Sequence, residues 1–230
     1  MSLTAALIED LRFPAPDVRA LLLWVQDPAF SFRPGQWVDL HVPGIDRPGG
    51  YSLTTTPTRL AESRCIGLAV KRSAHPVCRW LHQQAGKGDV VHLAVGGEVY
   101  WTPSPRKDVL VAGGIGITAC WSIFQAAVTS GSAPVCLIHG AHSRADLLFA
   151  DQIRALTATR AEVDYLPVLS GGDPDWDGAV GRVDAALLAG RLSPGDRLWL
   201  CGPPPMVDDL AAAAREIGLA ADDIHFESWW

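Results

Sequence analysis

The chain has 230 residues, of which 48% are hydrophobic and 19% are charged, and its formal net charge at pH 7 is -6. This hydrophobic content supports a buried core and excludes a chain that is disordered throughout. The acidic balance argues against nucleic acid as the main partner, because a phosphate backbone requires a basic surface. The length accommodates one large domain or two small ones.

The cysteines and histidines show no spacing that is typical of a metal site. The five cysteines form an odd set without a C-x-x-C pair, which argues against a disulfide framework, a zinc site or an iron–sulfur cluster. His139 and His142 flank a glycine after a strand-like run, and we expect both at loop positions. The N-terminus lacks a basic lead, and no apolar run reaches membrane-spanning length. These features predict a cytoplasmic protein with reduced thiols and no membrane insertion.

The N-terminal part, from Leu3 to about Trp101, reads as short strands separated by Pro/Gly turns. Many short strands at close spacing favour a small antiparallel β-barrel. One helix is expected to interrupt the strands, over residues 78–85. The candidate strands cover residues 21–25, 37–42, 51–54, 66–70 and 90–95.

The order of predicted elements changes after the proline-rich segment Thr102-Pro103-Ser104-Pro105. This change predicts two domains, 1–104 and 105–230. Strands and helices then alternate, and this order is typical of a doubly wound parallel sheet covered by helices. The expected strands cover 109–112, 135–139, 163–169, 198–201 and 224–227. The expected helices cover 119–128, 149–157, 183–188 and 205–217.

A glycine-rich turn lies between the first strand and the first helix of this second domain. Read from Gly114, the run Gly114-Ile115-Gly116-Ile117-Thr118-Ala119 is G-x-G-x-x-A, which fits the dinucleotide-binding fingerprint. Glycines allow close approach of a pyrophosphate, and the helix N-terminus offers unpaired N–H groups. A tight turn without a ligand also enriches glycine, so the strand before and the helix after it are what favour a nucleotide site.

Four segments, in this order and over nearly the full length, resemble the ferredoxin–NADP reductase-like flavoproteins. The likeness is closest to the branch called oxidoreductase NAD-binding domain-containing proteins. The segments are Tyr51-Ser52-Leu53, 111–118, 201–206 and 226–230. The resemblance implies an FAD-binding barrel of the FR type followed by an NAD(P)-binding α/β domain.

The resemblance also implies roles for residues of the barrel. Tyr51 would stack on the flavin, Ser52 would hydrogen-bond at flavin N5, and Leu53 would continue this contact. The family usually has arginine two positions before the tyrosine, where this chain has Gly49. Arg47 is near enough to bind the flavin phosphate in its place, and a solvated loop charge is the alternative.

A second flavin contact is implied where a strand ends at Val70-Lys71 and a helix opens at Val77-Cys78. Relatives use this helix N-terminus for the flavin phosphates, and backbone N–H groups can do so whatever the side chain. Lys71 can alternatively be a solvated charge at the strand end.

In the second domain, the resemblance implies that Gly113, Gly114, Ile115 and Gly116 cradle the nicotinamide dinucleotide, with Thr118 near its phosphate or ribose. The turn Cys201-Gly202-Pro203 would place Cys201 beside nicotinamide C4. No basic partner for this thiol is apparent, so we expect Cys201 to position the ring instead of acting as a nucleophile.

The C-terminal segment supplies the remaining implied residues. Glu227 and Trp229 match a carboxylate and an aromatic side chain that approach the flavin in relatives. Trp229 or Trp230 would cover the flavin ring and yield to nicotinamide, and an aromatic anchor in the core is the alternative.

The choice between NADH and NADPH stays open at this point. No acid follows the second strand until Asp146, and Arg144 is placed to meet a 2′-phosphate. However, relatives often have arginine at the position of His142, and NADP-specific relatives tend to have arginine at the position of Gly171.

We expect a flavin oxidoreductase that transfers hydride from NADH or NADPH to bound FAD, with Ser52, Cys201 and Glu227 at the reacting atoms. Electrons would then pass to an unidentified acceptor, either a separate carrier protein or a small molecule. Two alternatives remain: a redox-sensing or electron-transfer subunit without turnover of its own, and a flavin-free NAD(P) dehydrogenase.

Overall fold

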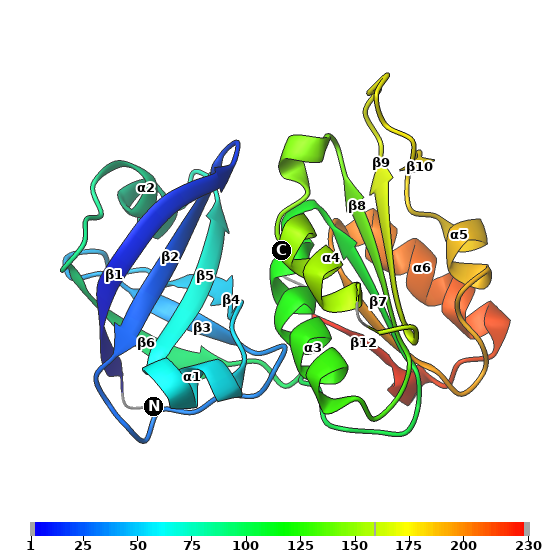
Figure 1. Cartoon of the computed structure of the whole chain (residues 1–230). Helices are drawn as coiled ribbons and strands as arrows, with labels where there is room; N and C mark the ends of the chain where they lie inside the picture. The colour runs from blue at the N-terminus through cyan, green and yellow to red at the C-terminus, as the bar shows by residue number, and fades with distance from the viewer. Residues whose placement is uncertain (1–2, 159, 228–230) are drawn as a thin grey trace. The chain divides into compact units, whose positions relative to one another are not determined.

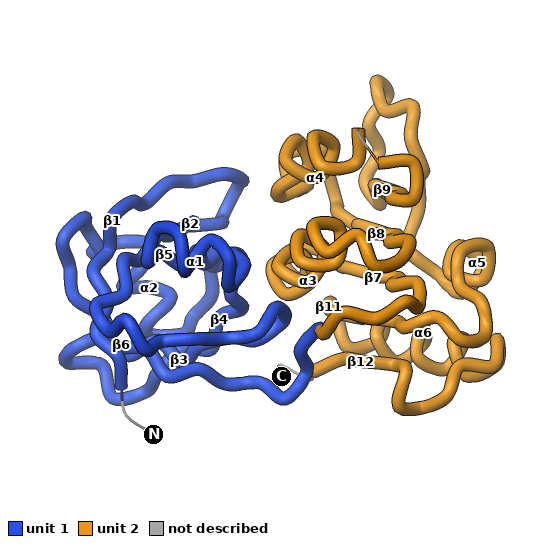
Figure 2. Tube along the Cα trace, turned by 60° about the horizontal axis from the view of Figure 1, so that its bottom comes forward, with its two compact units in different colours: residues 1–101 blue, residues 102–230 orange. Residues whose placement is uncertain are grey.

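The computed structural model describes residues 3–158 and 160–227. It separates into two compact units, Met1–Trp101 and Thr102–Trp230 (Figure 2). The division falls between Trp101 and Thr102, at the start of the proline-rich segment and three residues before the boundary expected after Ser104. Among the described residues, no helix is both long and apolar enough to cross a membrane.

Unit 1 is built on a six-stranded antiparallel sheet in the order β4-β3-β6-β1-β2-β5 (Figure 1). Its strands are β1 (Thr4–Ala15), β2 (Val18–Val25), β3 (Trp37–His41), β4 (Gly49–Ser52), β5 (Cys65–Lys71) and β6 (Val90–Gly96). Its helices are α1 (Pro57–Ser63) and α2 (Pro76–Gln83). An antiparallel bridge between Leu53 and Leu68 links the ends of the sheet, which closes it towards a barrel.

The core of unit 1 follows the two-residue period of its strands. In β2, Leu21, Leu23 and Val25 are buried, while the residues between them are partly exposed. Helix α1, which the sequence did not predict, has Thr56 as its N-cap and Pro57 in its first turn. Helix α2 begins two residues earlier than expected because Pro76 occupies its first turn, a position that proline favours.

Unit 2 is a parallel six-stranded sheet in the order β10-β9-β8-β7-β11-β12. Helices α3 and α4 lie on one face of the sheet, and α5 and α6 lie on the other (Figure 1). The strands are β7 (Asp108–Gly113), β8 (Val135–Ala141), β9 (Val163–Leu169), β10 (Ala179–Val180), β11 (Arg197–Cys201) and β12 (Ile224–Phe226). The helices are α3 (Ile117–Ser130), α4 (Ala150–Thr157), α5 (Ala185–Ala189) and α6 (Pro204–Ile217). This antiparallel sheet followed by a doubly wound parallel sheet is the fold class that the sequence predicts.

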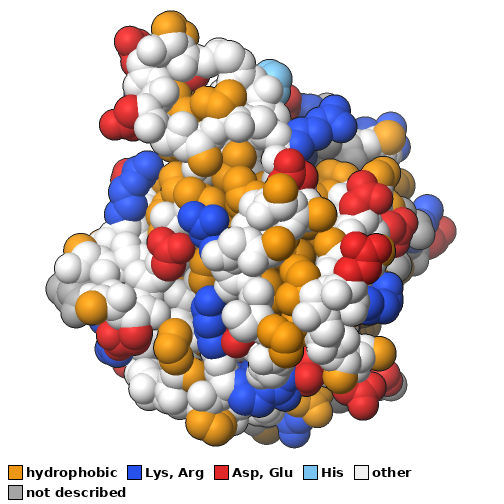
Figure 3. Space-filling view, turned by 90° about the vertical axis from the view of Figure 1, so that its right-hand side faces the viewer, with side chains coloured by type: hydrophobic (Ala, Val, Ile, Leu, Met, Phe, Trp, Pro, Cys, Tyr) orange, Lys and Arg blue, Asp and Glu red, His pale blue; other side chains and the backbone are white. Residues whose placement is uncertain are grey.

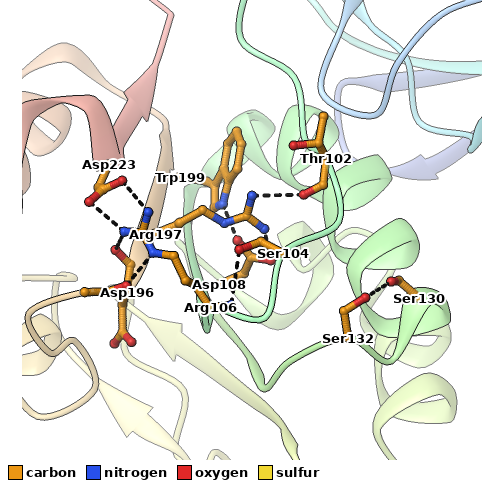
Figure 4. Close-up of polar contacts among 11 residues, drawn as sticks. Thr102, Ser104, Arg106, Asp108, Ser130, Ser132, Asp196, Arg197, Trp199 and Asp223 are labelled. Atoms are coloured by element: carbon orange, nitrogen blue, oxygen red, sulfur yellow. Dashed lines mark hydrogen bonds and ion pairs between the residues drawn. The ribbon is translucent and has the colours of Figure 1, made fainter.

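A buried polar cluster joins β7 to β11 near the beginning of both strands (Figure 4). The Asp108 carboxylate accepts a hydrogen bond from Arg197 Nη2 at 2.8 Å and one from Trp199 Nε1 at 2.8 Å. Arg197 Nη1 also donates to the Thr102 carbonyl oxygen at 2.9 Å. Asp108 is only 2% exposed. The cluster therefore fixes which residues of the two strands lie opposite one another.

His139 lies inside β8, so the expectation of a loop position for it is wrong. The strand continues to Ala141 because it pairs with β9 along its whole length. The His139 ring is fully buried, and its Nδ1 lies 3.2 Å from the Tyr165 hydroxyl oxygen. Burial lowers the pKa of His139 to about 4.

The substitution Asp108→Asn should destabilise the protein by about 3–5 kcal/mol, because it removes the charge that balances a buried guanidinium. Urea unfolding measures this change. Asp151→Asn is the matched control: it breaks the exposed pair with Arg154 and should cost less than about 1 kcal/mol. Equal effects of the two substitutions would contradict the role given to the cluster.

The neutral form of His139 is the one that the fold accommodates, whereas an unfolded histidine titrates near the ordinary value of 6.5. The contribution of His139 to the free energy of unfolding is therefore fully present above about pH 6.5 and is lost as the pH falls towards 4. We expect a loss of about 2 kcal/mol between about pH 7.5 and about pH 5 from this group. Unfolding curves of His139→Gln should lack this part of the pH dependence, and those of the exposed-residue control His142→Gln should keep it.

Candidate functional site

The glycine turn of unit 2 carries two glycines that are required for different reasons. Strand β7 ends at Gly113, a short 3-10 turn covers Gly114–Gly116, and α3 begins at Ile117. Gly114 has a φ of +55°, which side chains rarely adopt, although no atom lies within 4 Å of the place where its Cβ would be. The space above the turn at Gly114 is thus open.

Gly116 is required by a close backbone contact. A Cβ at this position would lie 2.2 Å from the Cys201 carbonyl oxygen and 2.5 Å from its carbon. Similarly, a Cβ at Gly202 would lie 3.0 Å from the Gly113 nitrogen. The glycine turn and the turn that follows β11 therefore pack backbone against backbone.

Parallel pairing of β7 with β11 brings these two turns together. Ala112 lies opposite Cys201 in the register, so both strands reach the same edge of the sheet before they turn. Met206, in the first turn of α6, fills the remaining space: its sulfur would lie 2.8 Å from a Cβ at Gly113. The sequence analysis missed Met206, since nothing in the local pattern marks a packing residue of this kind.

The α3 end of this edge suits a phosphate better than the α6 end does. The Ile117 N–H that opens α3 is bonded to the Gly114 and Ile115 carbonyl oxygens. Neither the 3-10 turn nor α3 has a side-chain cap, so the N–H groups of the turn itself are the ones that face an anion uncapped. Pro203, Pro204 and Pro205 at the start of α6 have no N–H to donate. Thr118, predicted near the phosphate or ribose, is buried and donates its hydroxyl to the Ile115 carbonyl oxygen at 2.9 Å. The turn fits a dinucleotide phosphate through its backbone.

The surroundings of Cys201 favour the neutral form of its thiol. Burial, followed by the nearby negative charge of Glu227, raises its pKa to about 12. Glu227 comes directly after β12, whose Phe226 lies opposite Leu200 of β11. The arrangement brings Glu227 near Cys201, and both burial and this carboxylate disfavour the thiolate. The predicted contacts of Trp229 and Trp230 lie outside the described residues.

In unit 1, Tyr51 has a hydroxyl group that its surroundings do not satisfy. The oxygen is buried and has no hydrogen-bond partner among the described residues. Burial, with a smaller effect from Cys78, raises the pKa of Tyr51 well above its usual range. The ring lies over Gly49, where an added Cβ would come within 2.5 Å of the hydroxyl oxygen. The missing side chain at position 49 is thus what makes room for the tyrosine.

The start of α2 lies beside this tyrosine and next to a positive charge. His75, the N-cap residue, makes no side-chain cap hydrogen bond, so the first N–H groups of the helix are not capped by its own side chain. Burial and the charge of Arg47 lower the pKa of His75, which places Arg47 near the start of the helix. An unpartnered phenol, an uncapped helix and an arginine form a set that fits a phosphate-bearing cofactor such as FAD.

The other predicted flavin residues serve the local structure of unit 1. Cys78 Sγ donates to the Lys71 carbonyl oxygen at 3.2 Å and accepts from the Ser73 N–H at 3.1 Å, so its side chain holds the loop before the helix. The side chains of Leu53, Val70 and Val77 are buried in the core. Ser52 lies opposite Trp37 at the end of β4 and is half-buried. For the four residues other than Ser52, contact with a cofactor would therefore run through the backbone.

Arg144 is already paired in unit 2. It lies in the short 3-10 turn Arg144–Asp146 after β8, and its guanidinium makes two hydrogen bonds to the Asp173 carboxylate. The sequence analysis did not single out Asp173, although the acidic run that contains it is visible in residues 173–177. In the described ranges, no group of three or more His, Cys, Asp or Glu side chains is arranged to hold a metal ion.

Gly116→Ala should weaken binding of NAD⁺ by about ten-fold or more, because the new methyl group would force the two turns apart. Isothermal titration calorimetry measures the change. Gly190→Ala is the control, since a Cβ there meets its nearest neighbours at ordinary distances of 3.8 and 3.9 Å. Unchanged binding by Gly116→Ala would show that the contact of the turns does not shape the site.

Comparison with known proteins agrees with this architecture. The oxidoreductase NAD-binding domain matches residues 110–212. The chain is 34% identical to oxidoreductase NAD-binding domain-containing protein 1 of Danio rerio, over 100% of this chain and 93% of the relative. It is 30% identical to ferredoxin–NADP reductase B of Sorangium cellulosum (strain So ce56), over 87% of this chain and 86% of that protein.

A solved structure shares the fold over nearly the whole chain. The cytochrome P450 reductase GcoB of Amycolatopsis superposes with a TM-score of 0.86 at 29% identity, over 97% of this chain and 68% of that one. The two units, their order along the chain and the sequence similarity over its full length lead to one conclusion. The chain belongs to the oxidoreductase NAD-binding domain-containing proteins, within the ferredoxin–NADP reductase-like superfamily.

Proposed function

We propose that this protein is an FAD-dependent oxidoreductase that takes hydride from NADH or NADPH and passes electrons to a separate carrier protein or a small acceptor. The observation that carries the proposal is the backbone contact between Gly116 and Cys201 in unit 2. It joins the open turn at Gly114 to a residue that could lie beside a nicotinamide ring. The unpartnered Tyr51 hydroxyl of unit 1 supports the flavin part of the proposal.

FAD, when bound to unit 1, would supply the chemistry of accepting a hydride and releasing electrons. The Tyr51 ring would pack on the cofactor, and the Ser52 hydroxyl would hydrogen-bond at its reactive nitrogen. Arg47 and the uncapped start of α2 would neutralise phosphate charge, with Lys71 adding a further positive charge at the end of β5. The resemblance to the family suggests these roles, and the surroundings of Tyr51 and His75 support them.

In unit 2, the backbone of the uncapped turn Gly114–Gly116, which leads into α3, would bind the pyrophosphate of the nicotinamide dinucleotide. Cys201 would present a neutral thiol to the ring, which its raised pKa keeps protonated across the physiological range. A neutral contact positions the ring without adding a charge to either redox state. Glu227 would place a carboxylate near the same thiol, where it can orient a polar group or hold a proton.

The relatives support an acceptor on another molecule. One of them is the reductase component DmpP of the phenol 2-monooxygenase of Pseudomonas sp. (strain CF600), 30% identical over 94% of this chain and 62% of that protein. GcoB is described as a cytochrome P450 reductase. The cysteines of this chain lack the spacing of an iron–sulfur cluster, so an onward centre would lie on a partner.

One observation favours a second candidate, an electron-transfer or redox-sensing subunit that shows no turnover without a partner. Because position 49 is a glycine, the arginine that relatives use for the flavin phosphate is missing. Arg47 would have to replace it, and the lowered pKa of His75 indicates that Arg47 lies near the start of α2. A weakly held flavin would limit steady turnover by the isolated chain. A flavin-free dehydrogenase would be colourless even with added FAD. The electron-transfer subunit would bind the cofactor but show no steady turnover without its partner, whereas the reductase would turn over alone.

The test is an anaerobic absorbance titration of FAD-loaded protein with NADH and then with NADPH. We expect the flavin band to bleach with at least one donor. Cys201→Ala should slow bleaching by about ten-fold or more while binding of NAD⁺ changes little, because the ring loses its positioning contact. Cys65→Ala, which replaces a half-buried thiol of unit 1, is the control and should bleach at the original rate. Failure of both donors to bleach the flavin would overturn the proposed function.

A further inference from the structure

The pairing of Arg144 has a consequence for the choice of dinucleotide. Arg144 follows β8, whose Gly140 lies opposite Gly113 at the end of β7, so it stands one strand away from the glycine turn. In sheets of this kind, the adenosine ribose of a dinucleotide is read at the end of this second strand. An arginine here can bind a 2′-phosphate only if its guanidinium is available.

The guanidinium of Arg144 is engaged on one edge by a carboxylate, while its side chain stays 45% exposed. Nε donates to Asp173 Oδ2 at 2.6 Å and Nη2 donates to Asp173 Oδ1 at 2.8 Å, the fork geometry of a strong pair. The Trp176 ring centre lies 5.9 Å from the guanidinium carbon. That ring is itself fixed by the hydrogen bond from its Nε1 to the Ala179 carbonyl oxygen at 2.9 Å.

The loop that supplies Asp173 is acidic. It joins β9 to β10 and carries Asp173, Asp175 and Asp177, and all three carboxylates act on Arg144 and raise its pKa. In the space-filling view this loop projects at the top and shows acidic side chains at its rim (Figure 3). The local charge is therefore negative even with Arg144 included.

Two neighbouring positions, Gly171 and Asp146, offer no replacement for Arg144. A side chain at Gly171 is blocked, because its Cβ would lie 2.5 Å from the His142 carbonyl oxygen. Asp146 is occupied as well: its Oδ2 accepts hydrogen bonds from the Ser143 N–H at 3.1 Å and hydroxyl at 2.7 Å. Neither position therefore supplies a positive charge that could meet a phosphate.

We infer that unit 2 selects NADH over NADPH, because Asp173 occupies the arginine that a 2′-phosphate would need. This inference rests on the proposed function and specifies its hydride donor. A 2′-phosphate carries nearly two negative charges and would have to displace Asp173 while remaining beside the other carboxylates. The 2′-hydroxyl of NADH is neutral, so these carboxylates do not repel it and it does not need Arg144.

The experiment measures dissociation constants of NAD⁺ and NADP⁺ by calorimetry, since neither oxidised dinucleotide reduces the flavin. The full-length protein should bind NAD⁺ about ten-fold or more tightly than NADP⁺. Asp173→Asn should improve NADP⁺ binding by about ten-fold and change NAD⁺ binding by less than about two-fold. Asp151→Asn, which frees Arg154 on α4 in the same way, is the matched control and should alter neither constant.

Arg144→Gln keeps the test independent of how the loop responds to Asp173→Asn. In the original protein it should leave NADP⁺ binding unchanged, and combined with Asp173→Asn it should abolish the gain. If Arg144→Gln alone weakens NADP⁺ binding by about ten-fold, Arg144 binds the phosphate and the inference is overturned. Equal affinity for both dinucleotides also overturns it while leaving the proposed function standing. Binding of neither dinucleotide would instead refute the proposed function itself.

Discussion

The contact between two backbone turns in unit 2 is the constraint on which the candidate site depends. The Cys201 carbonyl oxygen occupies the space that a side chain at Gly116 would need, and a Cβ at Gly202 would lie 3.0 Å from the Gly113 nitrogen. Because no side chain separates the turns, the start of α3 and the Cys201 thiol lie at one edge of the sheet. A dinucleotide whose pyrophosphate binds at one turn can then reach the other with its nicotinamide.

This contact requires that β7 and β11 pair in one register, and the polar cluster near the start of the strands enforces it. Asp108 accepts hydrogen bonds from both Arg197 and Trp199 of β11. A shift by one residue would turn these side chains to the opposite face of the sheet and leave the carboxylate buried without them. Burying the ion pair has a desolvation cost that offsets much of its attraction, so its contribution is better understood as specificity than as stability. The cluster at the start of β7 and β11 sets the register, and this register brings together the two turns at the other end of the strands.

The sequence pattern predicted those parts of the fold that depend on residues close together in the chain. The glycine turn, the order of elements in unit 2 and the bounds of β9 follow from hydrophobic runs and from residues that break them. The features that the pattern did not predict depend on contacts between residues far apart in the sequence. His139 looked like a loop residue beside Gly140, yet β9 extends the strand past both. Likewise, the partner of Arg144 lies 29 residues away, and only the meeting of the β8 and β9 ends brings Asp173 to it. Whether an arginine is available to a ligand is decided by such a partner and is invisible in the local sequence.

The same reasoning applies to the arginine that unit 1 lacks. Position 49 carries no side chain, and the Tyr51 ring lies in the space above it with its hydroxyl group buried and unpartnered among the described residues. An arginine at position 49 would have to displace this ring, so the glycine and the position of the tyrosine are coupled. Positive charge near α2 comes instead from Arg47, whose effect is felt at His75. In both units, therefore, the position of a cation depends on its neighbours. In unit 2 the Asp173 carboxylate pairs with Arg144, and in unit 1 the Tyr51 ring takes the space that an arginine at position 49 would need.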